Sequence, residues 1–167
     1  METANATRVS LAQTPLFRGL PADVVVDLEA ATRCREFAAG DVVLVAEADR
    51  PHDFFVVLDG IVQLVRDVGD HRPLRLAEVG PGGWFGEFAV IDGRSGSATA
   101  RARSPALIAV VPRGKMIEVL AGHPLVALRI MERMVEVIRQ LDDRIACFHG
   151  VDDRIDAIHR ELLRLTI

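Results

Sequence analysis

Between positions 37 and 111, hydrophobic residues recur in short runs, and each run is separated from the next by turn-forming residues. The runs lie at 42–46, 54–58, 61–65, 74–79, 97–102 and 106–111. The intervening segments contain Ala-Gly-Asp, Asp-Gly, Val-Gly-Asp and Pro-Gly-Gly, which are turn signals. Short strands at this spacing are typical of an all-β sandwich or barrel. The pattern therefore predicts a compact β domain in the middle of the chain.

The N-terminal part shows a different pattern. Residues 1–12 have no strong periodicity, so we expect a loose arm or a short helix there. Residues 14–33 read as a turn followed by a helix that begins at Pro21, with an acidic residue in its first turn. Its apolar residues fall on one face, which predicts a helix packed against another element: Val24, Leu28 and Ala31.

The C-terminal part is predicted to be helical. After Pro112, residues 113–122 read as a short helix ended by Gly122 and Pro124, and a long helix follows. Along the long helix, apolar residues alternate spacings of four and three: Ala127, Met131, Met134, Ile138, Leu141, Ile145 and Phe148. Such a heptad seam, flanked by charged residues, favours two copies packed in parallel, so we expect a homodimer. The alternative is that the stripe packs on its own β domain, or does both.

Gly150 is expected to end the long helix, and a short amphipathic helix follows it. We therefore divide the chain into an arm at 1–13, a β domain with its N-terminal helix at 14–122, the long helix at 123–149 and a short helix at 150–167.

Composition narrows the class of protein. With 167 residues and 50% hydrophobic content, the chain suits one substantial core, and its net charge of −4 with no basic run gives no sign of nucleic-acid binding. No segment resembles a signal peptide or approaches the roughly 20 apolar residues of a membrane span, so we expect a cytoplasmic protein. Cys34 and Cys147 lie in different predicted elements, which favours reduced thiols over a disulfide.

The glycine-rich stretch at 80–90 is the first candidate for chemistry. Gly82, Gly83 and Gly86 allow the backbone to approach a ligand closely, and successive amides in such a turn form an anion-binding nest. Glu87 would repel a phosphate unless it accepted hydrogen bonds from hydroxyl groups of the same ligand, as acids do with ribose. The pair favours a nucleotide over a bare phosphate. The alternative is a tight corner of the barrel with no ligand.

Five segments in order resemble the cyclic nucleotide-binding domain family, which the Crp/Fnr bacterial regulators, protein kinase A regulatory subunits and gated channels share. The segments are 14–28, 37–49, 54–65, 76–93 and 97–111, and the resemblance extends over about 14–148. It implies a mainly β fold with flanking helices: an eight-stranded β-roll (a double-stranded β-helix or jelly roll) followed by a long C-terminal dimerisation helix.

The family's phosphate-binding cassette has a Phe-Gly-Glu triplet followed about ten residues later by Pro-Arg-x-Ala-Thr/Ser. The resemblance implies that the glutamate binds the ribose 2′-hydroxyl, nearby amides bind phosphate and the arginine pairs with the cyclic phosphate. Here the matching residues are Phe85, Gly86 and Glu87, followed by Phe88 and Ala89, and then Ser97, Ala98 and Thr99.

The sequence departs from the cassette at two positions. Ser95 stands at the proline position and Gly96 at the arginine position. Loss of charge-assisted hydrogen bonds of about 1.5 to 3 kcal/mol would weaken binding roughly ten- to 150-fold. Arg94 lies two residues earlier, and its long side chain is a candidate substitute. The alternative is a solvated loop charge.

A further departure concerns the purine ring. Crp-like members place small hydroxyl residues of the long helix near the purine, and gap-free counting puts these positions at about Leu141 and Asp142. Asp142 is a candidate acceptor for an exocyclic amino group, or a solvated surface residue. The purine preference is left open, and both cAMP and cGMP are candidate ligands.

An enzyme is not expected. A small β-roll resembles the cupin barrel, but a metal-dependent enzyme needs clustered His and Glu ligands, and the five histidines are scattered over different elements. Cys147 and His149 form a lone C-x-H pair, which is weak evidence for zinc. No nucleophile lies beside an obvious base, and Ser95 and Ser97 sit in the cassette. We expect no cofactor and no metal.

A transcription factor is the stronger alternative. Residues 151–165 resemble the first helix of the winged helix-turn-helix of Crp-like regulators, but too few residues follow for a recognition helix, so no DNA binding is expected. The sequence therefore predicts a stand-alone dimeric sensory module that binds cAMP or cGMP weakly, or an altered ligand, and signals to an unknown protein partner by a conformational change. The alternatives are the effector domain of a longer regulator and a dimeric interaction module with a vestigial pocket.

Overall fold

The computed structural model describes residues 10–46, 52–69, 73–94, 96 and 98–164, and their side chains as far as 143 together with that of Ile145. The chain divides into two compact units, Met1–Ala127 and Leu128–Ile167. The two units are described separately below.

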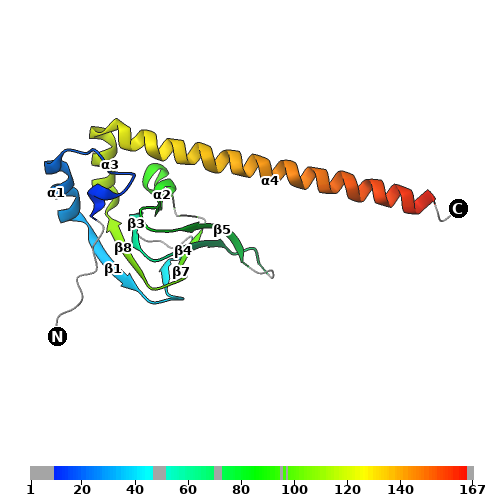
Figure 1. Cartoon of the computed structure of the whole chain (residues 1–167), viewed down its shortest axis with the longest axis horizontal. Helices are drawn as coiled ribbons and strands as arrows, with labels where there is room; N and C mark the ends of the chain where they lie inside the picture. The colour runs from blue at the N-terminus through cyan, green and yellow to red at the C-terminus, as the bar shows by residue number, and fades with distance from the viewer. Residues whose placement is uncertain (1–9, 47–51, 70–72, 95, 97, 165–167) are drawn as a thin grey trace. The chain divides into compact units, whose positions relative to one another are not determined.

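The described part of the first unit contains eight strands in two four-stranded sheets (Figure 1). In spatial order the first sheet contains β1 (Arg33–Phe37), β8 (Ala106–Val111), β3 (Phe54–Asp59) and β6 (Trp84–Phe85). The second contains β2 (Val42–Leu44), β7 (Thr99–Ala102), β4 (Val62–Arg66) and β5 (Leu74–Val79). Every pairing is antiparallel. The predicted eight-stranded β-roll is confirmed.

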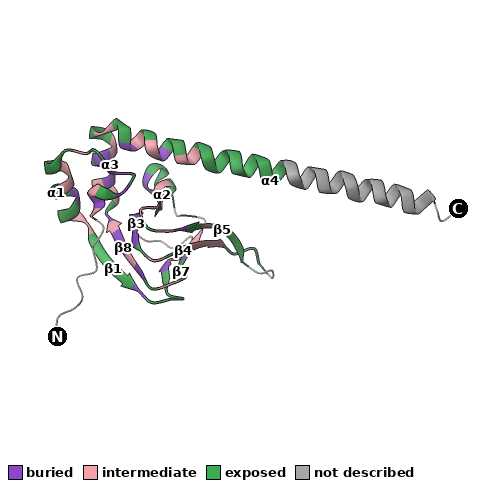
Figure 2. Cartoon of the chain, in the orientation of Figure 1, coloured by how far each residue is buried: buried purple, intermediate pink, exposed green. Residues whose placement is uncertain are grey.

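The β-roll is held together by a cluster of buried side chains contributed by both sheets (Figure 2). Strand β3 has buried side chains on both faces of its sheet, because Phe54, Phe55, Val56, Val57 and Leu58 are all buried. A run of consecutive buried residues is expected of a strand covered on both sides. From β3, Phe55 and Val57 belong to the cluster between the sheets. The remaining members of the cluster are Phe37, Val43, Val62, Val79, Phe85, Ala100, Ala102, Ala106 and Ile108.

Short helices precede and follow the strands. They are the 3-10 helix η1 (Leu11–Gln13), α1 (Ala22–Ala31) and α3 (Arg113–Gly122). Pro21 occupies the N-cap of α1, as the sequence predicts, and Leu28 on the predicted apolar face is fully buried. Lys115 of α3 forms ion pairs with Asp27 of α1 and, at 2.8 Å, with Glu118. The ion pair with Asp27 connects α3 to α1, whereas that with Glu118 lies within α3.

The long helix α4 runs from Pro124 to Arg164 without a break. The prediction that it ends at Gly150 is therefore wrong, and the predicted short C-terminal helix is a continuation of α4. The physical reason is energetic, because one glycine inside a helix costs only about 1 kcal/mol relative to alanine. The division into arm, β domain and helices otherwise stays a prediction.

The predicted seam on α4 is largely exposed in the single chain. Met131, Ile138, Leu141 and Ile145 are 49–56% exposed, whereas Met134 and Ala127 are half-buried. The side chain of Phe148 lies outside the described residues. Figure 2 shows the described part of α4 becoming mostly exposed along its length. Within the part of the chain that the structure describes, no helix combines the length and apolar character needed to cross a membrane.

Candidate ligand-binding site

The glycine-rich turn connects β6 to a short helix, α2 (Glu87–Asp92), that the sequence pattern did not predict. Gly86 is the N-cap of α2 and has a φ of 91°. A Cβ built on Gly86 would lie 2.7 Å from the carbonyl oxygen of Asp53 and 3.2 Å from the ring of Phe55. Both the left-handed backbone and the close approach require glycine at this position. As a result Glu87 is the first residue of α2, where its side chain is half-buried.

Aromatic packing holds this turn against the β-roll. The rings of Phe85 and Phe55 stack with centroids 4.8 Å apart and an interplanar angle of 3°. The two residues are also direct partners in the pairing of β6 with β3. On α2, Ala89 and Val90 are buried, whereas Phe88 is 52% and Ile91 49% exposed. The turn therefore has a fixed inner face and an apolar outer face.

The C-terminal end of α2 is fixed by its own cap and by α3. Gly93 adopts a φ of 70°, and its N–H donates to the carbonyl of Ala89 at 3.1 Å. Arg113 donates through Nε to the carbonyl of Val90 at 3.0 Å. A cationic donor at the C-terminus of a helix also interacts favourably with the helix dipole. Arg113 is part of this arrangement although it lies outside the cassette motif, so no motif comparison indicates it.

The segment after α2 lacks the family's arginine. Arg94 is exposed, and its backbone N–H donates to Asp92 Oδ1 at 2.8 Å. Gly96 is half-buried, and a Cβ built there would meet no atom within 4 Å. Its φ lies outside the left-handed range. Position 96 therefore has room for a larger residue.

Thr99 begins β7 and contacts the segment that follows β2. Its Oγ1 accepts a hydrogen bond from the N–H of Ala46 at 3.1 Å. The hydroxyl proton is left to donate elsewhere, because accepting that bond uses only a lone pair. Ala98 is half-buried beside it, whereas Ser97 and Ser95 lie outside the described residues.

The structure places the predicted cassette residues in one continuous stretch of the first unit, from β6 through α2 to the start of β7. Leu141 and Asp142 belong to α4 in the second unit, where both are exposed. Their part in a site stays a prediction. Among the described residues, no three His, Cys, Asp or Glu side chains are grouped so as to hold a metal ion.

A β-roll with a glycine turn, an acidic residue at the start of the next helix and a Ser-Ala-Thr segment has the features expected of a ligand-binding domain. The family model for the cyclic nucleotide-binding domain matches residues 34–123, which is more than half of the chain. The chain belongs to the cyclic nucleotide-binding domain family. Its phosphate-binding cassette departs from the family pattern at Gly96.

Similar proteins place this domain in larger chains. A cyclic nucleotide-gated potassium channel of Mesorhizobium japonicum is 38% identical over 93 residues, which are 55% of this chain and 24% of the channel. Glutaminase 2 of Bradyrhizobium diazoefficiens is 28% identical over 130 residues, which are 78% of this chain and 20% of that protein. The chain thus spans about a quarter or less of both relatives.

The fold is also that of a Crp/Fnr-type protein. The catabolite activator protein of Thermus thermophilus superposes with a TM-score of 0.70 at 24% identity, covering 81% of this chain and 63% of that structure. This likeness shows the fold.

Proposed function

We propose that this chain is a sensory module that binds a cyclic nucleotide, or a derivative of one, in the cassette at 85–99, and that responds by a conformational change. The observation that carries the proposal is the tight turn at Gly86, where the structure requires glycine. Glycine adopts this left-handed backbone readily and lets the turn pack against the Asp53 carbonyl, and glycine is the usual residue where a backbone must approach a ligand closely. The turn sets Glu87 at the start of α2, which suits the acceptance of hydrogen bonds from a ribose hydroxyl.

We expect weak affinity for cAMP and cGMP. The cyclic phosphate would lack the family's arginine because residue 96 is glycine. Arg94 is the candidate replacement, since its side chain is exposed and lies two residues away. Leu141 and Asp142 of α4 are the candidate purine contacts, and the conformational change that we propose is one in which ligand binding involves these residues.

The module is proposed to act as a homodimer, in which the ligand-dependent conformational change is transmitted to a partner protein. The exposed apolar residues of α4 are spaced as a heptad seam, and a second copy of the helix would bury them. A ligand shifts the module only as far as its affinities for the two conformations differ. A cytoplasmic location and an unnamed protein partner complete the proposal.

Isothermal titration of the purified chain with cAMP and with cGMP tests this function. We expect saturable binding that is lost in Glu87→Ala and weakened in Arg94→Ala. Arg139→Ala is the matched control, because Arg139 is an exposed arginine of α4 outside the cassette. The absence of both binding heat and thermal stabilisation at millimolar nucleotide would contradict the proposal. That result would favour a module with a vestigial pocket.

A second function has its own supporting observation. The likeness to the catabolite activator protein, of which this chain spans 63%, favours the effector domain of a Crp/Fnr-type transcription regulator. In that case the conformational change would act on a DNA-binding domain supplied by another segment or chain.

A further inference from the structure

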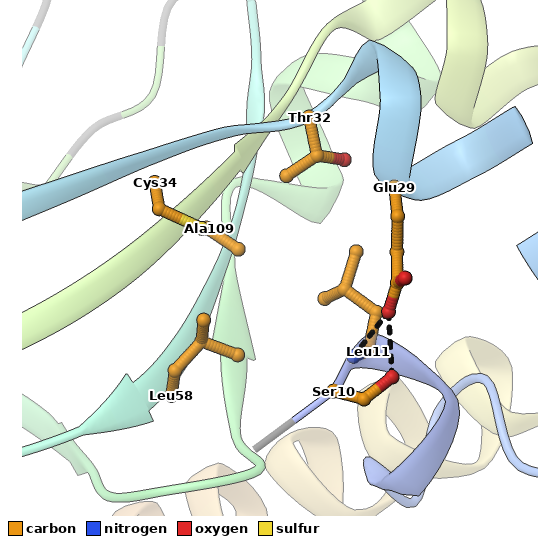
Figure 3. Close-up of a pocket in the computed structure, with 7 residues that line it drawn as sticks. All are labelled: Ser10, Leu11, Glu29, Thr32, Cys34, Leu58 and Ala109. Carbon is orange, nitrogen blue, oxygen red and sulfur yellow. Dashed lines mark hydrogen bonds between the residues drawn. The ribbon is translucent and has the colours of Figure 1, made fainter. Parts of the chain in front are cut away.

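The first unit contains a pocket that shares no residue with the cassette. It encloses about 270 Å³ and is lined by Ser10, Leu11, Glu29, Thr32, Cys34, Leu58 and Ala109. Figure 3 shows strand residues Cys34, Leu58 and Ala109 on one side of the space and Ser10, Leu11 and Glu29 on the other. The pocket therefore lies between the first sheet and the segment formed by η1 and the end of α1.

The inner wall of this pocket is apolar. Leu11, Leu58 and Ala109 are 3%, 5% and 0% exposed, respectively. Cys34 pairs with Ala109 across β1 and β8, so the two side chains share one face of the sheet. Such a wall excludes a strongly hydrated ligand and accommodates a compact apolar body.

The polar groups of the pocket offer acceptors rather than donors. The Ser10 hydroxyl donates to Glu29 Oε1 at 2.6 Å, and the N–H of Leu11 donates to the same oxygen at 3.2 Å. The Thr32 hydroxyl donates to the carbonyl of Leu28 at 2.7 Å. Both hydroxyl protons are therefore engaged inside the protein, whereas Glu29 Oε2 and a lone pair of Thr32 are left to accept from a ligand.

The charge of the lining residues also favours a ligand that donates hydrogen bonds. Glu29 is the one charged side chain among the seven described lining residues, and none of these is basic. A phosphate or carboxylate ligand would meet an uncompensated carboxylate, so nucleotides are unsuited to this pocket. A cationic donor would gain both an ion pair and a charge-assisted hydrogen bond.

We propose that this pocket is a second ligand site, and that it binds a small organic cation, an amine or amidine attached to a compact apolar body. The cation would bind Glu29 Oε2, and the apolar body would contact Leu11, Leu58 and Ala109. Because Glu29 also fastens η1 to α1 through Ser10 and Leu11, a bound cation would strengthen the contact of η1 with the β-roll.

Three probes of one shape and different charge test the proposal: benzylammonium, benzyl alcohol and benzoate. Each is titrated into the full chain, with backbone amide NMR shifts as the measurement. We expect saturable shifts at Leu11, Cys34, Leu58 and Ala109 with benzylammonium, and no saturable shifts there with benzoate. Equal responses to benzylammonium and benzyl alcohol, shifts confined to the cassette, or no saturable response would overturn the proposal.

Variants separate the ion pair from the shape of the pocket. Glu29→Gln keeps an acceptor for Ser10 but removes the charge, and we expect benzylammonium to bind roughly five-fold more weakly, as loss of a solvent-facing ion pair would give. Asp23→Asn, an exposed acid in the first turn of the same helix, is the matched control and should bind as the wild type does. Cys34→Leu fills the space from an exposed position and should abolish binding. Unchanged affinity in Glu29→Gln or in Cys34→Leu would contradict the proposed site.

Discussion

Arg113, the first residue of α3, donates through Nε to the carbonyl of Val90 in α2 at 3.0 Å. Its guanidinium also lies close to Gly93, where an added Cβ would be 3.5 Å from an Nη atom. Because Val90 is buried and α2 carries the candidate ligand site, this bond joins the cassette directly to α3. In turn, Lys115 joins α3 to α1. A displacement of α2 would therefore reach both neighbouring helices.

Removal of this donor should loosen the end of α2. In Arg113→Met the aliphatic stem is kept and the hydrogen bond is lost, so we expect a loss of stability of about 1 to 2 kcal/mol. Urea unfolding measures the global effect, and hydrogen exchange of the amides of 89–93 measures the local one. Arg139→Met on α4 is the control and should change stability by less than about 0.5 kcal/mol. Wild-type exchange rates at 89–93 in Arg113→Met would contradict the assigned role.

Gly86 should not tolerate a side chain. In Gly86→Ala the left-handed backbone costs about 1 to 2 kcal/mol, and the Cβ would also lie 2.7 Å from the Asp53 carbonyl. We expect a loss of at least about 2 kcal/mol in the free energy of unfolding, measured by urea titration. Gly96→Ala is the matched control, because a Cβ at 96 meets nothing within 4 Å. Equal losses in the two variants would show that position 86 does not require glycine.

Restoration of the missing cation should raise the affinity for cyclic nucleotides. A Cβ at Gly96 meets no atom within 4 Å, and an arginine there would supply charge-assisted hydrogen bonds to phosphate that strengthen cAMP binding roughly ten- to 150-fold. Isothermal titration of Gly96→Arg beside Gly96→Gln measures this gain. Glutamine supplies length without charge and should give little gain. If both variants bind as the wild type does, the remaining cassette does not hold a cyclic phosphate.

The ion pairs of Lys115 predict an alkaline transition. The hydrogen bond from Lys115 to Asp27, followed by that to Glu118, raises the pKa of Lys115 above its ordinary value of 10.5. Since the folded-state pKa is the higher one, the stabilisation is complete below pH 10.5 and is lost as the pH rises through the folded-state pKa.

The alkaline transition can be assigned to Lys115, because it is the only lysine and the chain has no tyrosine that would titrate in the same pH range. The difference in urea midpoint between the wild type and Lys115→Met should be constant from pH 8 to about 10 and should shrink at higher pH. A difference that does not depend on pH would mean that Lys115 contributes through packing alone.

The seam on α4 should control association. An aspartate at position 138 would place a charge in the middle of the proposed dimer contact, so we expect Ile138→Asp to dissociate at least about ten-fold more readily than the wild type. Sedimentation equilibrium measures the association. Gln140→Asp adds the same charge beside the seam and should leave association intact. A monomeric wild type at high concentration would contradict the proposed homodimer.

Hydrophobic pattern predicted the central strands well, because β3 and β8 are nearly continuous apolar runs. It failed at β1, where Arg33, Cys34, Arg35 and Glu36 are all exposed and only Phe37 is buried. Strand β1 is held instead by its pairing with β8. The local sequence pattern does not indicate this pairing, because the two strands are far apart in the chain. Helix α2 was missed because its six residues lie between two glycines that also favour a turn.

For the candidate site, motif spacing indicates the cassette residues but not the residues that pack against them. Asp53 lies 34 residues before the first residue of α2 and Arg113 lies 21 residues after its last residue, and neither belongs to a motif. The pocket between η1 and the first sheet was also not predicted from the sequence. The contact of Ser10 with Glu29 joins residues 19 positions apart and depends on how α1 packs.

The polar strand β1 has one more consequence. It is an edge strand of the first sheet, and an unprotected edge offers its free backbone groups to any extended chain that approaches. Charged side chains at Arg33, Arg35 and Glu36 make that approach unfavourable, since an added strand would have to desolvate them. The β-roll therefore resists growth into larger sheets through this edge.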